Sequence, residues 1–257
     1  MMLELKSARW AELTHADGPA SDVPELLTRL SAGDETAIQD LSAVLCHQGR
    51  VFDSSFAVVP HLVDIAARVD EPDLKANTLV LVGLIASSSN ERSEGSLAPD
   101  IDAAYRAALP EALQLSIATL QLSFEPYDAV YLLQTAAWLH GLSTLGRVLA
   151  GFLDEEFSIQ CPKCDRELFV CPDEEAGGFS TAGEDPIESP QTHRTPMIPG
   201  PAPGSANGAH YHWLLEVGGE SALSAIGTQL PYLFGSGACP LCNAPFTLLE
   251  QLSAQSN

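Results

Sequence analysis

Two short cysteine motifs constrain this chain more than any other feature of its sequence: Cys161-Pro162-Lys163-Cys164 and Cys239-Pro240-Leu241-Cys242. Each has the Cys-x-x-Cys spacing of a knuckle, a tight turn that presents two thiolates to one tetrahedral metal ion. The residue after such a turn usually adopts a left-handed backbone conformation, which Asp and Asn tolerate better than most residues. Asp165 and Asn243 occupy these two positions. The sequence therefore predicts one structural zinc ion held by Cys161, Cys164, Cys239 and Cys242.

Other uses of four cysteines are less consistent with the sequence. Disulfides need an oxidising compartment, and residues 1–6 lack the basic start and apolar run of a secretory signal, so we expect a reduced, cytoplasmic chain. Redox chemistry usually needs one Cys-x-x-Cys at the start of a helix, whereas two near-identical copies favour shared ligation. Iron could occupy the same four thiolates. Because four thiolates close the coordination sphere, the ion is expected to hold structure and to perform no chemistry.

The two remaining cysteines carry less information. Cys171 follows a short apolar run and is either a spare ligand or a buried thiol, of which we favour the second. Cys46 lies at the end of an apolar helical pattern and is expected to pack in the core.

Charge excludes several classes of partner. The 257 residues include 34 acidic and 12 basic side chains, for a net charge of −22, which repels phosphate backbones and anionic membranes. We therefore expect no nucleic-acid partner and no membrane partner, and the longest apolar stretch, 76–86, is too short to cross a bilayer. The negative charge serves either solubility alone or the attraction of a basic protein.

The first part of the chain, 1–154, has the apolar spacing of successive helices with short connections. An apolar-Pro-x-apolar-apolar pattern occurs in it three times, at intervals typical of two-helix repeats. The pattern predicts a mainly α fold, either a HEAT-like helical repeat or an irregular α-α superhelix. Beyond two helices within 22–49, the expected helices cover 54–68, 72–88, 98–108, 111–123, 126–140 and 143–153.

Residues 45–62, which include His47-Gln48-Gly49 and Val59-Pro60-His61-Leu62, resemble a bacterial group of HEAT-like proteins. In that group a His-Gln-Gly turn joins two helices, and an apolar-Pro-x-Leu segment lies in the second. The resemblance implies the helical fold but no settled activity, and helical repeat proteins of this kind usually act by binding other proteins. His47 and Gln48 either belong to a binding edge or form a turn whose polar side chains satisfy helix-end carbonyls; we favour the turn.

The second part, 155–257, is expected to be a small zinc-ribbon β region. Alternating residues at 157–160 and 167–170 predict a hairpin around the first knuckle, and 246–249 can complete the sheet after the second. Between the knuckles, the acidic, Pro- and Gly-rich segment 172–209 predicts a flexible loop, and a helix is expected over 219–229.

These features favour a non-enzymatic protein-binding module with a structural zinc site, which could neutralise a basic protein such as a toxin, in the manner of an immunity protein. The alternative is a metal-dependent enzyme that acts on a small molecule through a site assembled from distant residues. His210 and His212 would point the same way if they lay on a strand, but no acidic residue beside them completes a catalytic pattern. The sequence therefore leaves enzymatic activity open and favours its absence.

Overall fold

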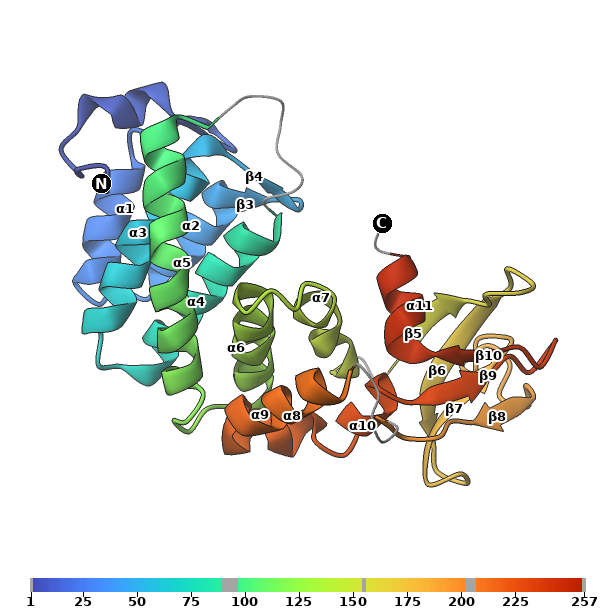
Figure 1. Ribbon diagram of the computed structural model, residues 1–257. Coiled ribbons are helices and arrows are strands. Elements are labelled where there is room, and N and C mark those ends of the chain that lie inside the picture. The colour runs from blue at the N-terminus through green and yellow to red at the C-terminus, as the bar shows by residue number, and fades with distance from the viewer. Residues whose placement is uncertain (1, 89–96, 154–155, 202–206, 256–257) are drawn as a thin grey trace.

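The computed structural model describes residues 2–88, 97–153, 156–201 and 207–255 (Figure 1). Helices α1 to α5 lie at one end of the molecule, strands β5 to β10 lie at the other, and α6 to α9 lie between them. The α-helices are α1 (Val23–Ser31), α2 (Thr36–Leu45), α3 (Asp53–Arg68), α4 (Pro72–Ser87), α5 (Pro99–Thr119), α6 (Pro126–Leu139), α7 (Leu145–Val148), α8 (Gly208–Val217), α9 (Gly219–Ile226), α10 (Leu230–Leu233) and α11 (Leu248–Ala254). The described chain is therefore mainly α, as the sequence predicts.

The helices agree closely with the apolar spacing of the sequence, with one informative difference. The expected spans 54–68, 72–88 and 126–140 correspond to α3, α4 and α6. The two helices expected at 98–108 and 111–123 are instead one continuous helix, α5, with Pro110 inside it. Pro110 is exposed, so the carbonyl that loses its helical hydrogen bond can bind water instead. The last expected helix, 143–153, is a short α7 followed by a 3₁₀ turn, Leu149–Phe152.

A two-residue hairpin joins α2 to α3 at the His-Gln-Gly segment. Strands β3 (Cys46–His47) and β4 (Arg50–Val51) pair antiparallel, and Gln48 and Gly49 between them have φ of 51° and 76°. Positive φ at both central residues is the geometry of a type I′ turn. His47 and Gln48 are exposed, whereas the hydroxyl of Ser55 donates to the last carbonyl of α2, that of Leu45, at 2.7 Å. The amide of Ala16 donates to the preceding carbonyl, that of Val44, at 3.0 Å. Among the described residues these two groups bond the end of α2, and not the side chains of His47 and Gln48 as expected.

Two apolar cores lie along the molecule. The first includes side chains of α1 to α5, among them Phe56, and Trp10 from the segment before α1. The second joins α6 and α7 to α8, α9 and the strands that follow residue 156, and α4 contributes to both cores. The α9 helix packs on α6, and His140 at the end of α6 stacks on Trp213 of α8 at 4.3 Å between ring centroids. The expected domain boundary, 154/155, lies outside the described residues, and the second core includes residues on both sides of it.

The strands form two antiparallel sheets around the knuckles. One has the order β5-β6-β7-β8, and the other pairs β9 with β10. Their bounds are β5 (Phe157–Gln160), β6 (Glu167–Asp173), β7 (Gly178–Ala182), β8 (Arg194–Pro196), β9 (Ser236–Ala238) and β10 (Pro245–Thr247). The hairpin expected from 157–160 and 167–170 is confirmed, since Phe157 pairs with Val170 and Gln160 with Glu167.

The segment 172–209, expected as a loop, contains β7 and β8, while its residues 202–206 lie outside the described part. Phe179 explains the difference, because its buried ring contacts Phe152 and Tyr232 and ties β7 to the second core. The segment 246–249 also differs: Phe246 lies in β10, which pairs with β9 in a separate two-stranded sheet, and Leu248 already begins α11.

Candidate metal centre

The first knuckle connects β5 to β6. The amide of Cys161 donates to the carbonyl of Arg166 at 2.8 Å, and the amide of Asp165 donates back to the carbonyl of Cys161 at 3.1 Å. Asp165 has φ of 54°, the left-handed conformation predicted for this position. These bonds bring residues 161 and 166 together and leave the two thiols at the tip of the turn.

The second knuckle connects β9 to β10 and repeats the same pattern. Cys239 donates its amide to the carbonyl of Ala244 at 2.9 Å, and Asn243 donates its amide to the carbonyl of Cys239 at 2.9 Å. Asn243 has φ of 57°, again as predicted. The two turns are therefore built alike, although they belong to separate sheets and lie far apart in the sequence.

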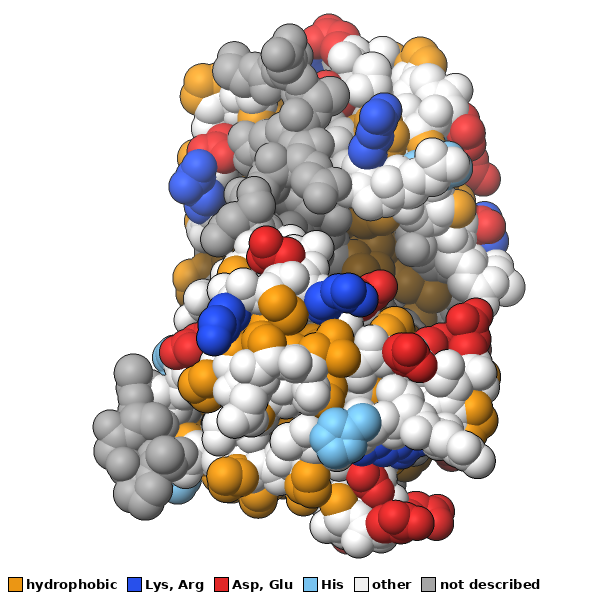
Figure 2. All heavy atoms as spheres, turned by 90° about the vertical axis from the view of Figure 1, so that its right-hand side faces the viewer, with side chains coloured by type: hydrophobic (Ala, Val, Ile, Leu, Met, Phe, Trp, Pro, Cys, Tyr) orange, Lys and Arg blue, Asp and Glu red, His pale blue; other side chains and the backbone are white. Residues whose placement is uncertain are grey.

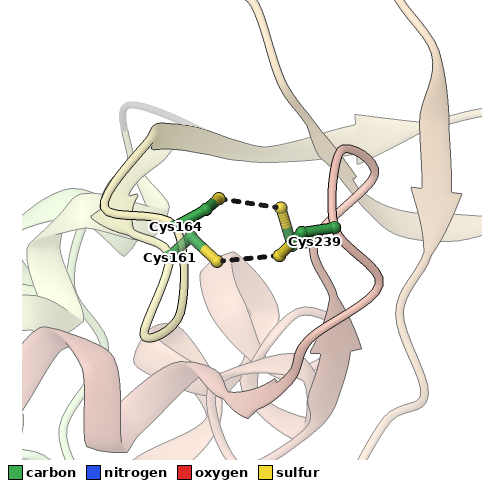
Figure 3. A group of neighbouring side chains, drawn as sticks. Cys161, Cys164 and Cys239 are labelled. Atoms are coloured by element: carbon green, nitrogen blue, oxygen red, sulfur yellow. Dashed lines mark hydrogen bonds between the residues drawn. The ribbon is translucent and has the colours of Figure 1, made fainter.

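The two knuckles face each other, and their four sulfurs form one cluster. Figure 3 shows Cys161 and Cys164 of the first turn opposite Cys239 of the second. The sulfur of Cys161 lies 3.6 Å from that of Cys242, and the sulfur of Cys164 lies 3.9 Å from that of Cys239. All four sulfurs lie within 4.8 Å of one another. The structure thus brings together the four cysteines that the sequence predicts as ligands.

These distances fit a tetrahedral metal ion. Zinc–sulfur bonds of about 2.3 Å in tetrahedral geometry place the sulfurs roughly 3.8 Å apart, close to both measured separations. A disulfide would need about 2.05 Å, so the cysteines are free thiols at these distances. A four-sulfur set is also the donor chemistry that zinc and iron prefer in tetrahedral sites.

Backbone amides around the sulfurs favour negative charge there. Burial alone would oppose ionisation of Cys161, but hydrogen bonds from the amides of Cys164 and Lys163 and from neighbouring thiols lower its pKa to about 7. At Cys242 the amide of Ala244 favours the thiolate, but burial and the other thiols outweigh it and raise the pKa to about 12. Without a metal, therefore, the sulfurs share protons unequally, and a divalent cation can replace those protons.

The cluster has an inner and an outer side. Cys161 and Cys239 are each 1% exposed and belong to the second apolar core, whereas Cys164 and Cys242 are partly exposed. An ion at this place would connect the four-stranded sheet directly to β9 and β10, and through them to the end of the second core.

The other residues considered from the sequence lie elsewhere. Cys171 is buried on β6 outside the four-sulfur cluster, and burial raises its pKa. Cys46 packs against the first core, where burial raises its pKa to about 12. His210 and His212 lie on helix α8, so positions two apart point to different sides and do not form a pair. Within the described residues, the four cysteines are the group of His, Cys, Asp or Glu side chains that could hold a metal ion.

Comparison with known proteins gives no relative. No family model, no curated protein and no solved structure matches this chain. Among the described residues, no helix is both long and apolar enough to cross a membrane.

Proposed function

We propose that the chain is a protein-binding module whose ribbon is stabilised by one structural zinc ion, and that its partner is a basic protein. The four-sulfur cluster supports the metal, because both sulfur separations match tetrahedral ligation and four thiolates leave no open coordination position. A closed site of this kind stabilises a fold, and the reducing, cytoplasmic setting expected from the sequence keeps the thiols available.

The excess of acidic side chains is the reason for proposing a basic partner. With 34 acidic and 12 basic residues, the surface creates a negative field that speeds the approach of a positively charged protein. A basic toxin such as a nuclease is one partner of this class, since an acidic protein can cover a phosphate-binding cleft. HEAT-like stacking of the helices, also part of the proposal, would present an extended surface to the partner.

We assign the contact with the basic partner to the ribbon, the region of strands β5 to β10 with the two knuckles, which carries acidic side chains. Figure 2 shows the face on which the ribbon lies, with a group of Asp and Glu side chains at its lower end. Burial, together with the nearby carboxylates of Asp185 and Glu167, raises the pKa of Glu156. A surface hollow of about 760 Å³ between β6, β7 and β8 is lined by the acidic Asp173, Glu174 and Glu175 and by the basic Arg194. Carboxylates that repel one another, as those around Glu156 do, gain from the approach of a cation.

Capture and kinetics test the proposal together. The tagged chain should retain one stoichiometric basic protein from its own cell lysate at low salt, and the association rate of the purified pair should fall about tenfold or more as salt rises. Recovery of no specific protein, or an association rate independent of salt, would contradict the proposal.

Charge reversal tests the assignment to the ribbon. Glu174→Lys with Glu175→Lys should slow association more than Glu12→Lys with Glu25→Lys, a control pair of exposed residues in the first core region that makes the same change in net charge. Equal slowing by the two pairs would show that only net charge matters and would remove the ribbon from the contact.

A further inference from the structure

An open cavity of about 400 Å³ lies between helices α1 and α3, among residues far along the chain from the four cysteines of the cluster. His61, Ile65 and Arg68 line it from one face of α3, because residues spaced by three, four and seven positions share a helix face. Leu27 and Ser31, four residues apart, line it from α1 in the same way. The segment 2–6 closes a third side. The cavity is thus built by three elements that the fold holds together.

The segment that closes the cavity is fixed in place. The carbonyl of Leu3 accepts a hydrogen bond from Nε2 of His61 at 2.8 Å. The carbonyl of Glu4 accepts from the indole of Trp10 at 3.1 Å and from the amide of Ser7 at 2.9 Å. These bonds hold the wall of the cavity in one position, so a ligand would meet a preformed site.

His61 offers one hydrogen-bond acceptor to the cavity. A carbonyl can only accept, so Nε2 must carry the proton, and Nδ1 of the neutral ring has a free lone pair. Within the described residues Nδ1 has no hydrogen-bond partner. The side chain is only 6% exposed, and burial lowers its pKa, which keeps the ring neutral near pH 7. The bond to Leu3 and the carboxylate of Asp64 oppose that shift without reversing it.

The rest of the lining is apolar at the bottom and charge-balanced at the rim. Leu27 and Ile65 are 1% and 3% exposed, and the side chains of Met2 and Leu5 continue this apolar surface to the mouth. The charged side chains around it are two acidic and two basic: Glu4, Asp64, Lys6 and Arg68. Asp64 and Arg68 already pair at 2.5 Å. A rim with no net charge does not select a charged ligand.

We infer that this cavity binds an uncharged amphipathic small molecule, whose hydroxyl or amine donates to Nδ1 of His61 while its apolar body lies against Leu27 and Ile65. The site is separate from the cysteine cluster and does not depend on the proposed protein partner. Its chemistry follows from one unpaired acceptor on a largely buried ring, beside an apolar surface.

Two probes that differ by one donor test the inference on the full chain. 4-Ethylphenol carries a hydroxyl donor and 4-ethylanisole does not. The protein should bind the phenol about fivefold more tightly, as expected for one hydrogen bond, and the ¹⁵N resonance of His61 Nδ1 should shift only with the phenol. Equal affinity for the two probes, or no saturable binding of 4-ethylphenol, would overturn the inference.

Two variants place the binding in this cavity. Ser31→Phe puts a ring at the exposed mouth and should abolish binding of both probes, whereas Ser224→Phe, at an exposed serine on α9, should leave it unchanged. His61→Phe should remove the preference for the phenol, provided that circular dichroism shows a native fold. If Ser31→Phe binds 4-ethylphenol as the unmodified chain does, the cavity is not the site.

Discussion

Loss of one ligand from each knuckle should destabilise the C-terminal half of this molecule and leave the N-terminal helices folded. The double substitution Cys161→Ser with Cys239→Ser leaves two sulfurs, too few to hold a structural zinc ion. The strands around the knuckles should then loosen, while α1 to α3 should persist because they are packed in the first core, to which the ribbon does not contribute.

The length of chain between the two knuckles gives an estimate of the stability that is lost. Because the ion leaves the unfolded chain, its binding free energy adds directly to the free energy of unfolding. A permanent link across the 78 residues between positions 161 and 239 would contribute about 4.5 kcal/mol, which we take as the lower bound. We therefore expect the free energy of unfolding of the C-terminal half to fall by at least about 4 to 5 kcal/mol. A domain of this kind has only about 5 to 15 kcal/mol in total, so the loss should be large enough to unfold the ribbon locally.

Hydrogen exchange and metal analysis measure the effect. Amides of Ile159 in β5 and Leu168 in β6 should lose most of their protection, and that of Val59 in α3 should keep it. Cys171→Ser is the matched control: it changes a buried thiol on β6 outside the cluster, and the variant should retain one zinc ion per chain.

Two results would refute this reasoning. Stoichiometric zinc in the double variant would show that the four cysteines are not the ligands. Equal loss of protection in α3 and β5 would show that the two cores, which share α4, unfold as one unit.

Three smaller changes test other parts of the account. Asn243→Val should weaken zinc binding and cost about 1 to 2 kcal/mol in chemical denaturation, because a β-branched residue is strained at φ of 57°, whereas Asn243→Gly should be tolerated. Gly83→Ala should lower the melting temperature by an amount equivalent to about 1 to 3 kcal/mol, because the added carbon would lie 2.3 Å from the hydroxyl of Thr135 where α4 meets α6; an unchanged melting temperature would contradict this contact. Hydrogen bonds from the Thr36 hydroxyl and then from a neighbouring guanidinium lower the pKa of Asp34 below its usual 3.8, so its contribution to stability is present above that pH and is lost as the pH falls through the lowered value. The difference in melting temperature between the unmodified chain and Asp34→Asn should therefore shrink as the pH falls below 3.8, and a difference that grows on acidification would contradict the assignment.

Local signals in the sequence were sufficient where one residue determines the conformation. Asp165 and Asn243 were predicted to be left-handed from their place after a Cys-x-x-Cys turn alone, and both have positive φ. Helices α3, α4 and α6 were also predicted from the spacing of apolar residues, although the structure buries residues on several sides of each. The cluster of four sulfurs could also be predicted from the sequence, because one tetrahedral metal ion needs four ligands close together.

Tertiary contacts decided the rest. Pro110 marks a helix end by local rules, yet α5 continues through it because the residue faces solvent. β7 could not be predicted from composition, because Phe179 lies among residues typical of loops. Its contacts with Phe152 and Tyr232, which stabilise the strand, form only in the folded chain. The cavity at His61 had no signal in the sequence, because the segment that closes it lies 58 positions away from that residue.

X-ray absorption spectroscopy of the purified chain tests the central claim most directly, because it identifies the metal and its ligands together. The account predicts one zinc ion per chain, surrounded by four sulfur atoms at about 2.3 Å. Iron in its place would change the identity of the ion while keeping the cluster. A coordination shell that contains nitrogen or oxygen ligands, or a chain that binds no metal when zinc is supplied under reducing conditions, would contradict the account.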